Sequence, residues 1–188
     1  MLNHKGTKTI KTQRLLLRRF NYRDSEAMFN NWANDERVTE FLTWTPHGDV
    51  SLTKQLICHW CWLYEKENYY NWCIVFDGKP IGNISVVRTD EKSEHMDLGY
   101  CIAYDYWNNG IVTEAAKAVI DYLFTEICAN RLSIWHAVKN PASGKVAKKC
   151  GMSFEGVQRQ YYKSWDGEYL DIAVWSILKN EYKPNLQL

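Results

Sequence analysis

The sequence predicts a mixed α/β (α+β) domain in which helices lie on both faces of one sheet. Three strand-like segments follow one another between residues 72 and 103, which indicates an antiparallel meander. Helical and strand-like segments alternate on either side of that meander. With 188 residues, 46% of them hydrophobic, the chain is long and apolar enough for one domain with a substantial core.

The first half is predicted to hold one strand and three helical segments. Residues 14–20, RLLLRRF, combine apolar residues and arginines in a run typical of a strand. Asp24 is expected to cap the first helix. A second helical turn near residues 38–42 and a loop at 43–49 precede a longer helix that begins at Ser51, because apolar residues recur there every three to four positions.

The second half alternates turn signals with strand-like and helical patterns. A polar loop at 106–115 runs directly into a helix with one apolar face. Asn140 and Pro141 predict a second helix start, and Gly151 predicts the end of that helix. The strands expected here are 72–76, 81–88, 97–103, 132–138, 153–161 and 169–177.

We expect a single domain at residues 12–183 behind a short basic arm at residues 1–11. The sequence shows no internal repeat, no low-complexity segment and no linker rich in proline and glycine. The arm is polar and therefore not typical of a signal peptide. No apolar run approaches the roughly 18 residues that a membrane span needs, so we expect a cytoplasmic protein that does not bind membranes.

The overall charge argues against direct binding of nucleic acid. Lys and Arg number 23 and Asp and Glu number 22, a formal net charge of +1, whereas proteins that hold nucleic acid by bulk charge are strongly basic. Segment 131–163 differs, with seven basic residues and one acid, Glu155. This segment attracts a polyanionic ligand or forms a solvated basic face, and the sequence leaves both interpretations open.

The cysteine pattern favours free thiols over a metal site or a disulfide framework. Cys58 and Cys61 form a C-x-x-C pair inside a helical pattern, but no second pair with zinc-ligand spacing follows. We therefore expect no bound metal and six reduced cysteines: Cys58, Cys61, Cys73, Cys101, Cys128 and Cys150.

Two helix starts are candidate ligand sites from the residues alone. Gly110 would let the backbone approach a phosphate closely at the start of one helix, where Thr113 would add a hydroxyl or cap the helix. At the other, Asn140 and Ser143 cap their own helix or reach a ligand beside the sheet. Neither start carries the signature of a P-loop or a dinucleotide fingerprint, and an ordinary capped helix is the competing interpretation at both.

Several segments resemble the GNAT superfamily of acetyl-CoA-dependent N-acetyltransferases, namely 100–113, 140–143 and 148–152. Within that superfamily the chain resembles the branch of ribosomal-protein-alanine (Rim-type) N-terminal acetyltransferases. The resemblance covers about residues 12–183. The segments that carry it are RLLLRRF at 14–20, LGYCI at 98–102, YWNNGIVTEA at 106–115, ANRL at 129–132 and NPASGKVAKKCGM at 140–152.

The resemblance implies a twisted, mostly antiparallel central sheet with two splayed central strands, which hold the pantetheine arm of acetyl-CoA between them. The splayed strand is 97–103. The pyrophosphate loop is 107–112, where only Gly110 matches the family pattern strictly and Val112 replaces a small residue. The residues expected to bind acetyl-CoA are Cys101, Ile102, Ala103, Asn108, Asn109, Gly110, Ile111, Val112, Thr113, Asn140 and Ser143.

The implied chemistry is direct attack of an amine on the thioester, which needs a proton acceptor for the amine and a proton donor for the departing thiolate. The resemblance places Asp97 at the position of the general base, with a solvated strand-end carboxylate as the alternative. The family's usual tyrosine acid is replaced by Ala147. Ser143 is the substitute acid that the Rim-type branch suggests, with a helix-start hydroxyl as the alternative.

We therefore expect an N-acetyltransferase that moves acetyl from acetyl-CoA to a protein N-terminal α-amine, ribosomal or other. A small amine such as an aminoglycoside or a polyamine is the second acceptor class. A non-catalytic acetyl-CoA-binding domain of the same fold is the alternative from a different class. Either a monomer or a homodimer fits the sequence.

Overall fold

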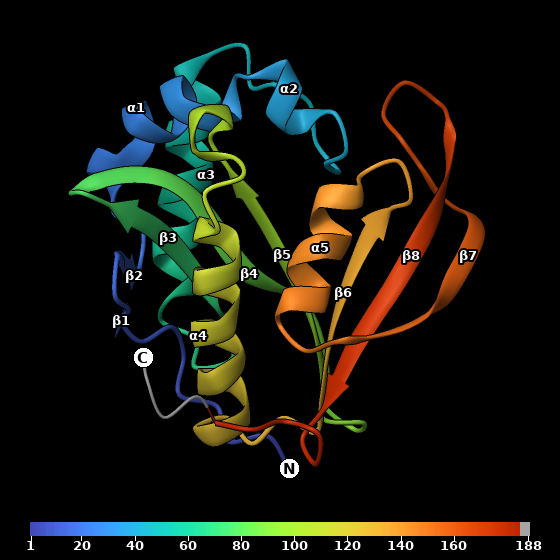
Figure 1. The fold of residues 1–188 in the computed structure, drawn as a ribbon. Helices are drawn as coiled ribbons and strands as arrows, with labels where there is room; N and C mark the ends of the chain where they lie inside the picture. Colours follow the sequence, from blue (N-terminus) through green and yellow to red (C-terminus); the bar gives the residue numbers. More distant parts are fainter. Residues whose placement is uncertain (185–188) are drawn as a thin grey trace.

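The centre of the computed structural model, which describes residues 1–184, is an eight-stranded sheet (Figure 1). Its strand order is β1-β2-β3-β4-β5-β6-β8-β7. Every neighbouring pair is antiparallel except β5 and β6, which run parallel. The strands are β1 (Ile10–Lys11), β2 (Leu15–Arg18), β3 (Asn71–Phe76), β4 (Lys79–Asp90), β5 (His95–Ile102), β6 (Arg131–Ala137), β7 (Ser153–Lys163) and β8 (Tyr169–Leu178).

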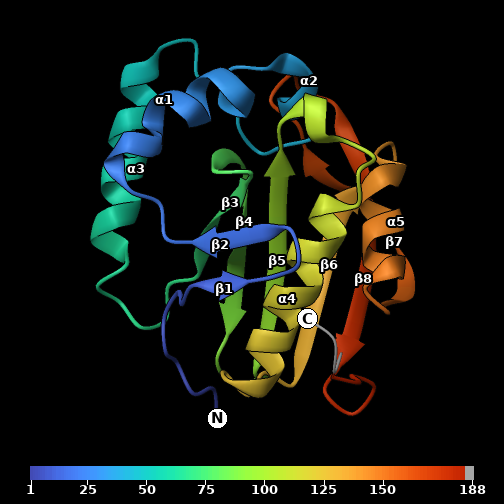
Figure 2. The ribbon, with the colours of Figure 1, turned by 60° about the vertical axis from the view of Figure 1, so that its left-hand side comes forward.

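The helical segments cover both faces of this sheet, which confirms the predicted mixed α/β class (Figure 2). No helix of residues 1–184 is long and apolar enough to cross a membrane. The helical segments are η1 (Tyr22–Asp24), α1 (Ser25–Met28), η2 (Phe29–Ala33), α2 (Glu36–Thr39), α3 (Val50–Leu63), η3 (Tyr104–Tyr106), α4 (Ile111–Thr125) and α5 (Pro141–Lys149).

Side-chain alternation along β5 separates two cores. Met96 and Leu98 are buried in a core that includes the apolar face of α4. Cys101 points to the opposite face, where it packs against a second core built by α1 and α3. Because successive residues of a strand face opposite sides of a sheet, each residue of β5 can be assigned to the α4 side or to the α1–α3 side.

The pairing of β5 and β6 stops halfway along the strands. Its last partners are Leu98 and Ile134, whereas β5 stays paired with β4 as far as Ile102. Beyond that point β5 and β6 diverge, and the predicted splay of two central strands is confirmed (Figure 1). We call this opening the fork. Gly82 of β4 keeps β5 close on its other side, because a Cβ at this glycine would lie 2.4 Å from the Cys101 carbonyl oxygen.

The predicted ends of α5 are confirmed, whereas two other predicted caps differ from the structure. Asn140 Oδ1 accepts the Ser143 N–H at 3.4 Å, and Gly151 follows the helix with φ +81°. Asp24 holds the predicted N-cap position of α1, but its side chain makes no cap bond there. Its carboxylate instead accepts both ends of the Arg18 guanidinium, at 2.7 and 2.8 Å. Thr113 does not cap α4, because Gly110 holds the N-cap position.

The expected basic arm packs against the rest of the chain. Ile10 and Lys11 form β1 against β2, and Leu2 is buried in the α4-side core. Trp72 of β3 donates its indole N–H to the Lys8 carbonyl oxygen at 2.7 Å. The boundary at residue 12 stays a prediction, and the two parts that it separates are in close contact.

Part of the positive charge of segment 131–163 is neutralised within the sheet. Arg131 of β6 donates to both oxygens of Glu155 on β7, each at 2.6 Å. Ser176 of β8 adds a third hydrogen bond to this carboxylate at 2.6 Å. The Arg131 guanidinium lowers the pKa of Glu155 to about 2, and burial opposes this shift only in part.

This carboxylate predicts an acid-sensitive contribution to stability. Because its folded pKa lies below its ordinary value of 4.5, the contribution is complete above pH 4.5 and is lost as the pH falls towards 2. Glu155→Gln removes the titrating group. We expect the melting temperature of this variant to fall less between pH 5 and pH 2 than that of the parent protein. Exposed Glu65→Gln is the control, and equal pH slopes for all three proteins would contradict the assignment.

Candidate functional site

The fork exposes the backbone of β5 to the space that β6 leaves. The Ala103 N–H donates to the Ile81 carbonyl on β4 at 2.8 Å. Because antiparallel residues alternate in direction, the Ile102 N–H points away from β4, towards the fork. The Ile102 carbonyl accepts the Trp107 indole N–H at 2.9 Å. Three residues are predicted to face pantetheine: Cys101, Ile102 and Ala103. Of these, Ile102 has its amide N–H on the fork side.

The loop between β5 and α4 presents backbone N–H groups at a helix start. Asn108 and Gly110 adopt left-handed conformations, with φ +61° and +73°. Gly110 is the N-cap of α4, and no side chain bonds to the first N–H groups of the helix. Such groups bind anions, because they point out of the helix and the helix dipole adds positive charge there. The predicted residues Asn109, Ile111, Val112 and Thr113 lie in this same loop and first turn.

Two charged residues that the sequence analysis missed hold this loop in place. The Arg14 Nε donates to Glu114 Oε2 at 2.7 Å, and its Nη1 donates to the Asn109 carbonyl at 3.1 Å. Thr12 donates to the other oxygen of Glu114 at 2.6 Å. Burial alone would raise the pKa of Glu114, but these hydrogen bonds lower it, so the carboxylate is ionised at neutral pH. The sequence signal for this contact was the arginines in RLLLRRF. A strand pattern does not show which residues such arginines bind.

On the α4 side of the sheet, the first turn of α5 reaches the fork. Tyr100 of β5 donates its hydroxyl to the Ser143 carbonyl at 3.3 Å. Burial raises the pKa of Tyr100, and hydrogen bonding with Ser143 opposes this only in part, so the phenol is protonated. Asn140 uses its side-chain oxygen as the cap of α5. Of the exposed lysines of α5, Lys145 follows this first turn, whereas Lys148 and Lys149 lie in the last turn of the helix.

Asp97 lies at the base of the fork in a network of polar side chains. Its register partner on β6 is Ser133, one step before the last paired residues. The Ser133 hydroxyl donates to Asp97 Oδ1, and His95 Nε2 lies 2.9 Å from the same oxygen. Arg88 Nη1 is 4.0 Å from Oδ2. Asp97 is only 5% exposed, so it is not the solvated carboxylate of the alternative interpretation.

The same network determines the charge of this carboxylate. Burial alone would raise the pKa of Asp97, because a buried carboxylate loses solvation. Hydrogen bonds from His95 and Ser133, together with the charge of Arg88, outweigh burial and lower the pKa below its ordinary value. Asp97 is therefore ionised at neutral pH.

Asp97 and Ser143 belong to opposite faces of the sheet. Asp97 shares its face with Cys101, which packs on the α1–α3 core. Ser143 contacts Tyr100, whose side chain packs against the α4-side core. The two candidate catalytic residues therefore flank the fork from its two sides.

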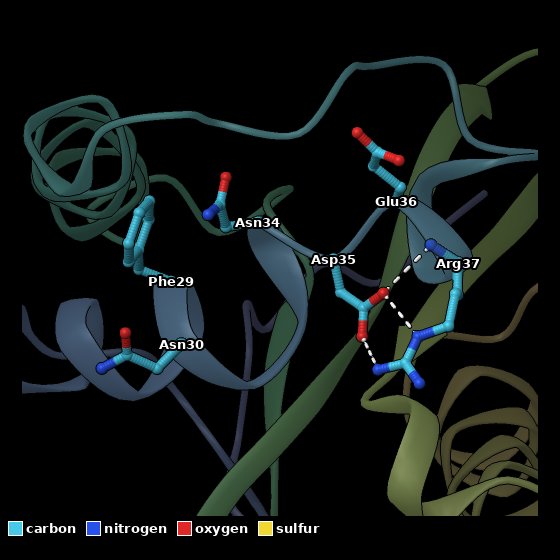
Figure 3. Close-up of a pocket in the computed structure, with 6 residues that line it drawn as sticks. All are labelled: Phe29, Asn30, Asn34, Asp35, Glu36 and Arg37. Carbon is cyan, nitrogen blue, oxygen red and sulfur yellow. Dashed lines mark hydrogen bonds and ion pairs between the residues drawn. The ribbon is translucent and has the colours of Figure 1, made fainter.

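Neither of two surface hollows is lined by a predicted site residue. One, of about 450 Å³, is lined by residues of η2 and α2 (Figure 3). Its charged pair is already satisfied, since Arg37 Nη2 donates to Asp35 Oδ2 at 2.6 Å. The other is lined by Arg159, Gln160 and Asp171 of the β7–β8 hairpin. Within residues 1–184 no group of three His, Cys, Asp or Glu side chains could hold a metal ion.

The family model described as acetyltransferase (GNAT) domain matches residues 14–153. The chain belongs to the GNAT acetyltransferase family. It is 28% identical over 176 residues to the uncharacterized N-acetyltransferase p20 of Bacillus licheniformis, and the alignment covers 93% of this chain and 98% of p20. It is 31% identical over 172 residues to YoaA of Bacillus subtilis (strain 168), also an uncharacterized N-acetyltransferase, covering 90% and 96% of the two chains.

Solved structures of the family share this fold. RimL, the ribosomal L7/L12 α-N-protein acetyltransferase, solved in complex with coenzyme A, superposes with a TM-score of 0.82 at 18% identity, covering 91% of this chain and 98% of RimL. A GNAT-family acetyltransferase of Bacillus anthracis gives a TM-score of 0.80 at 23% identity, covering 92% and 99%. This GNAT chain is an N-acetyltransferase that acts on an amine.

The loop before α4 predicts how cofactor binding responds to substitution at Gly110. Gly110→Pro removes one N–H and cannot adopt the observed φ of +73°, so we expect acetyl-CoA binding to be largely lost. Gly110→Ala keeps the N–H and meets no atom closer than Arg14 Nη2 at 3.7 Å, although its side chain is strained at this φ. We therefore expect Gly110→Ala to weaken binding less than Gly110→Pro. Calorimetry with acetyl-CoA measures both. An unchanged dissociation constant for the proline variant would exclude this loop as the binding site.

Proposed function

We propose that this protein transfers acetyl from acetyl-CoA to the α-amine of a protein or peptide N-terminus. The observation that carries the proposal is the fork, with an anion-binding helix start at one end and Asp97 and Ser143 on its two sides. A cytoplasmic location, which the sequence analysis expects and which the cysteine pattern fits, belongs to the same proposal. The six cysteines are unpaired.

The residues around the fork fit acetyl-CoA. Its pantetheine amides need backbone partners, and the Ile102 N–H faces the space where β6 has left. Its phosphates need donors and positive charge, which the first turn of α4 and the lysines of α5 provide. RimL was solved with coenzyme A, and the microcin C7 self-immunity acetyltransferase MccE with acetyl-CoA and AMP. Both share this fold, which supports the same cosubstrate here.

Asp97 is the proposed proton acceptor. An α-amine has a pKa of about 7.7–8.0, so an appreciable fraction is already neutral near pH 7. A weak base therefore suffices, which suits a carboxylate whose pKa is lowered. The ionised Asp97 would also attract the protonated amine to the fork. The proton then passes from the attacking nitrogen to this carboxylate, directly or through water.

Ser143 is the proposed proton donor. Its hydroxyl would give a proton to the sulfur as the C–S bond breaks, on the α4 side of the sheet. The N-terminus of α5 stabilises negative charge developing there, since its first turn carries the positive end of the helix dipole. Tyr100, held against Ser143, is protonated and fixes the position of this turn.

An N-terminal α-amine leads the acceptor classes because of the Rim-type resemblance and the fold shared with RimL. A lysine side chain, with a pKa of about 10.4, would need a stronger base than a carboxylate of lowered pKa. A ribosomal protein is the acceptor named for RimL, and it is the first candidate to test here.

Removal of the Ser143 hydroxyl tests the proposed acid. We expect Ser143→Ala to lower kcat by about 10²–10⁴, the usual contribution of a positioned acid, with little change in acetyl-CoA binding. If Ser143 only stabilises its helix, the rate stays near that of the parent protein. Thiol release and melting temperature, measured on the same preparation, separate the two outcomes.

Asp97→Asn tests the proposed base through its pH dependence. We expect turnover to fall most at pH 6, where the amine is protonated, and the defect to shrink at pH 9, where an α-amine is already neutral. Direct attack forms no acetyl-enzyme, so initial rates for the parent protein follow a sequential pattern. Parent-like rates for the variant from pH 6 to pH 9 would end the assignment of Asp97.

A further inference from the structure

Trp135 is the first residue of β6 that lines the fork. The last β5–β6 partners are Leu98 and Ile134, so the divergent stretch of β6 begins at Trp135. It shares its face of the sheet with Ser133, two residues earlier, whose hydroxyl bonds to Asp97. The indole therefore lies on the same side of the fork as the proposed base.

The indole nitrogen of Trp135 is buried and has no hydrogen-bond partner among the described residues. Burying a donor without an acceptor costs the free energy of desolvating it, so such groups are rare unless a ligand or water satisfies them. The two other unpaired buried atoms of the described residues belong to Trp32 in the α1–α3 core and Asn71 at the start of β3. Neither lies on the β5 or β6 edge of the fork.

The surroundings of this indole are aromatic and partly open. Tyr161 of β7 packs edge-on at 5.4 Å between ring centroids and is 54% exposed. Phe41, Tyr162 and Trp135 belong to a small cluster that joins the chain after α2 to β6 and the β7–β8 hairpin. The buried members of this cluster are Ala137, Leu170 and Ile172, so the indole has buried neighbours on one side and the exposed Tyr161 on another.

A positive charge stands beside the same indole. The Arg88 guanidinium carbon is 5.9 Å from the Trp135 ring centroid, and the Arg88 side chain is 57% exposed. Arg88 is also the register partner of Asp97 across β4 and β5. Three groups thus meet on one face of the sheet: a carboxylate, a guanidinium and an indole N–H without a partner.

We infer that Arg88 and Trp135 recognise the oxygen of a carbonyl or carboxylate group that is separated from the acceptor amine by one carbon atom. An α-amino carbonyl group is complementary to this set, since its amine suits Asp97 and its oxygen accepts from the donors Arg88 and Trp135. Polyamines carry no such oxygen, and their second ammonium is repelled by Arg88. The inference rests on the proposed function and narrows its acceptor to peptide N-termini or free amino acids.

The test compares three acceptors with the parent protein and Trp135→Phe, which keeps an aromatic ring but lacks the N–H. The acceptors are a tripeptide amide with a free N-terminus, L-alanine, and isopropylamine, which has no carbonyl. We expect Trp135→Phe to lower kcat/KM for the better carbonyl acceptor about tenfold, the value of one net hydrogen bond, and to leave isopropylamine unchanged. Trp62→Phe, at an exposed tryptophan of α3, is the matched control.

Arg88→Gln separates the two acceptor sources. If the acceptor is a free amino acid, its carboxylate pairs with Arg88, and Arg88→Gln lowers kcat/KM more than Trp135→Phe does. If the acceptor is a peptide N-terminus, Arg88→Gln lowers kcat/KM less than Trp135→Phe does. Equal effects of Trp135→Phe on carbonyl and carbonyl-free amines, or a parent protein that prefers isopropylamine, would overturn the inference.

Equilibrium binding keeps this inference separate from the proposed function. Calorimetry measures binding of the tripeptide amide and of L-alanine to the CoA-saturated protein. We expect Trp135→Phe to bind the better of these two acceptors more weakly than the parent protein does, by the same factor as the fall in kcat/KM. Binding that depends on Trp135 without turnover of any amine would refute the proposed activity and keep the subsite. No detectable binding of either acceptor by the parent protein would refute the subsite.

Discussion

The arrangement of the whole candidate site depends on the point where β5 and β6 stop pairing. β5 follows β4 through Ile102, and β6 follows β8 through Ala137, so the two central strands separate after Leu98 and Ile134. Backbone groups along this stretch lose their strand partner in the middle of a sheet. Since buried backbone groups are nearly always hydrogen-bonded, the fork favours a ligand that carries amide groups of its own.

Ion pairs and helix starts place the remaining parts around this opening. Arg14 and Glu114 tie the loop before α4 to the start of β2, so its N–H groups are fixed without any bound ligand. On the other side of the sheet, Arg88, His95 and Ser133 keep Asp97 ionised at the base of the fork. In the proposed reaction, the acceptor amine and the thioester sulfur would lie on opposite sides of the fork, beside the proposed base and the proposed acid respectively.

The sequence predicted the elements of this fold well, because most of them carry strong local signals. Asn140, Pro141 and Gly151 specify the ends of α5, and hydrophobic periodicity specifies α3 and α4. The two caps that differ from the prediction do so for different reasons. Asp24 bonds to Arg18, a partner six residues away that capping rules do not consider. Thr113 is displaced because Gly110 turns the chain before it.

The site was predicted less completely, since contacts between distant segments leave no local pattern. The resemblance suggested the loop, the splayed strand and Asp97 as parts of the site, but the residues that fix the loop and keep Asp97 ionised come from other segments. Glu114 and Arg14 are 100 residues apart, and Arg88, Asp97 and Ser133 lie on three neighbouring strands. The unpaired indole of Trp135 depends on where the β5–β6 pairing ends, which the sequence does not specify.

Amide hydrogen exchange, measured by NMR with and without acetyl-CoA, tests the fork most directly. We expect acetyl-CoA to slow exchange at Ile102 and at residues 108–113, whose N–H groups face the opening or the helix start. Ala103 is the internal control, because its N–H already donates to Ile81. Protection confined to the hollow at Phe29 and Arg37, with Ile102 unchanged, would contradict the account.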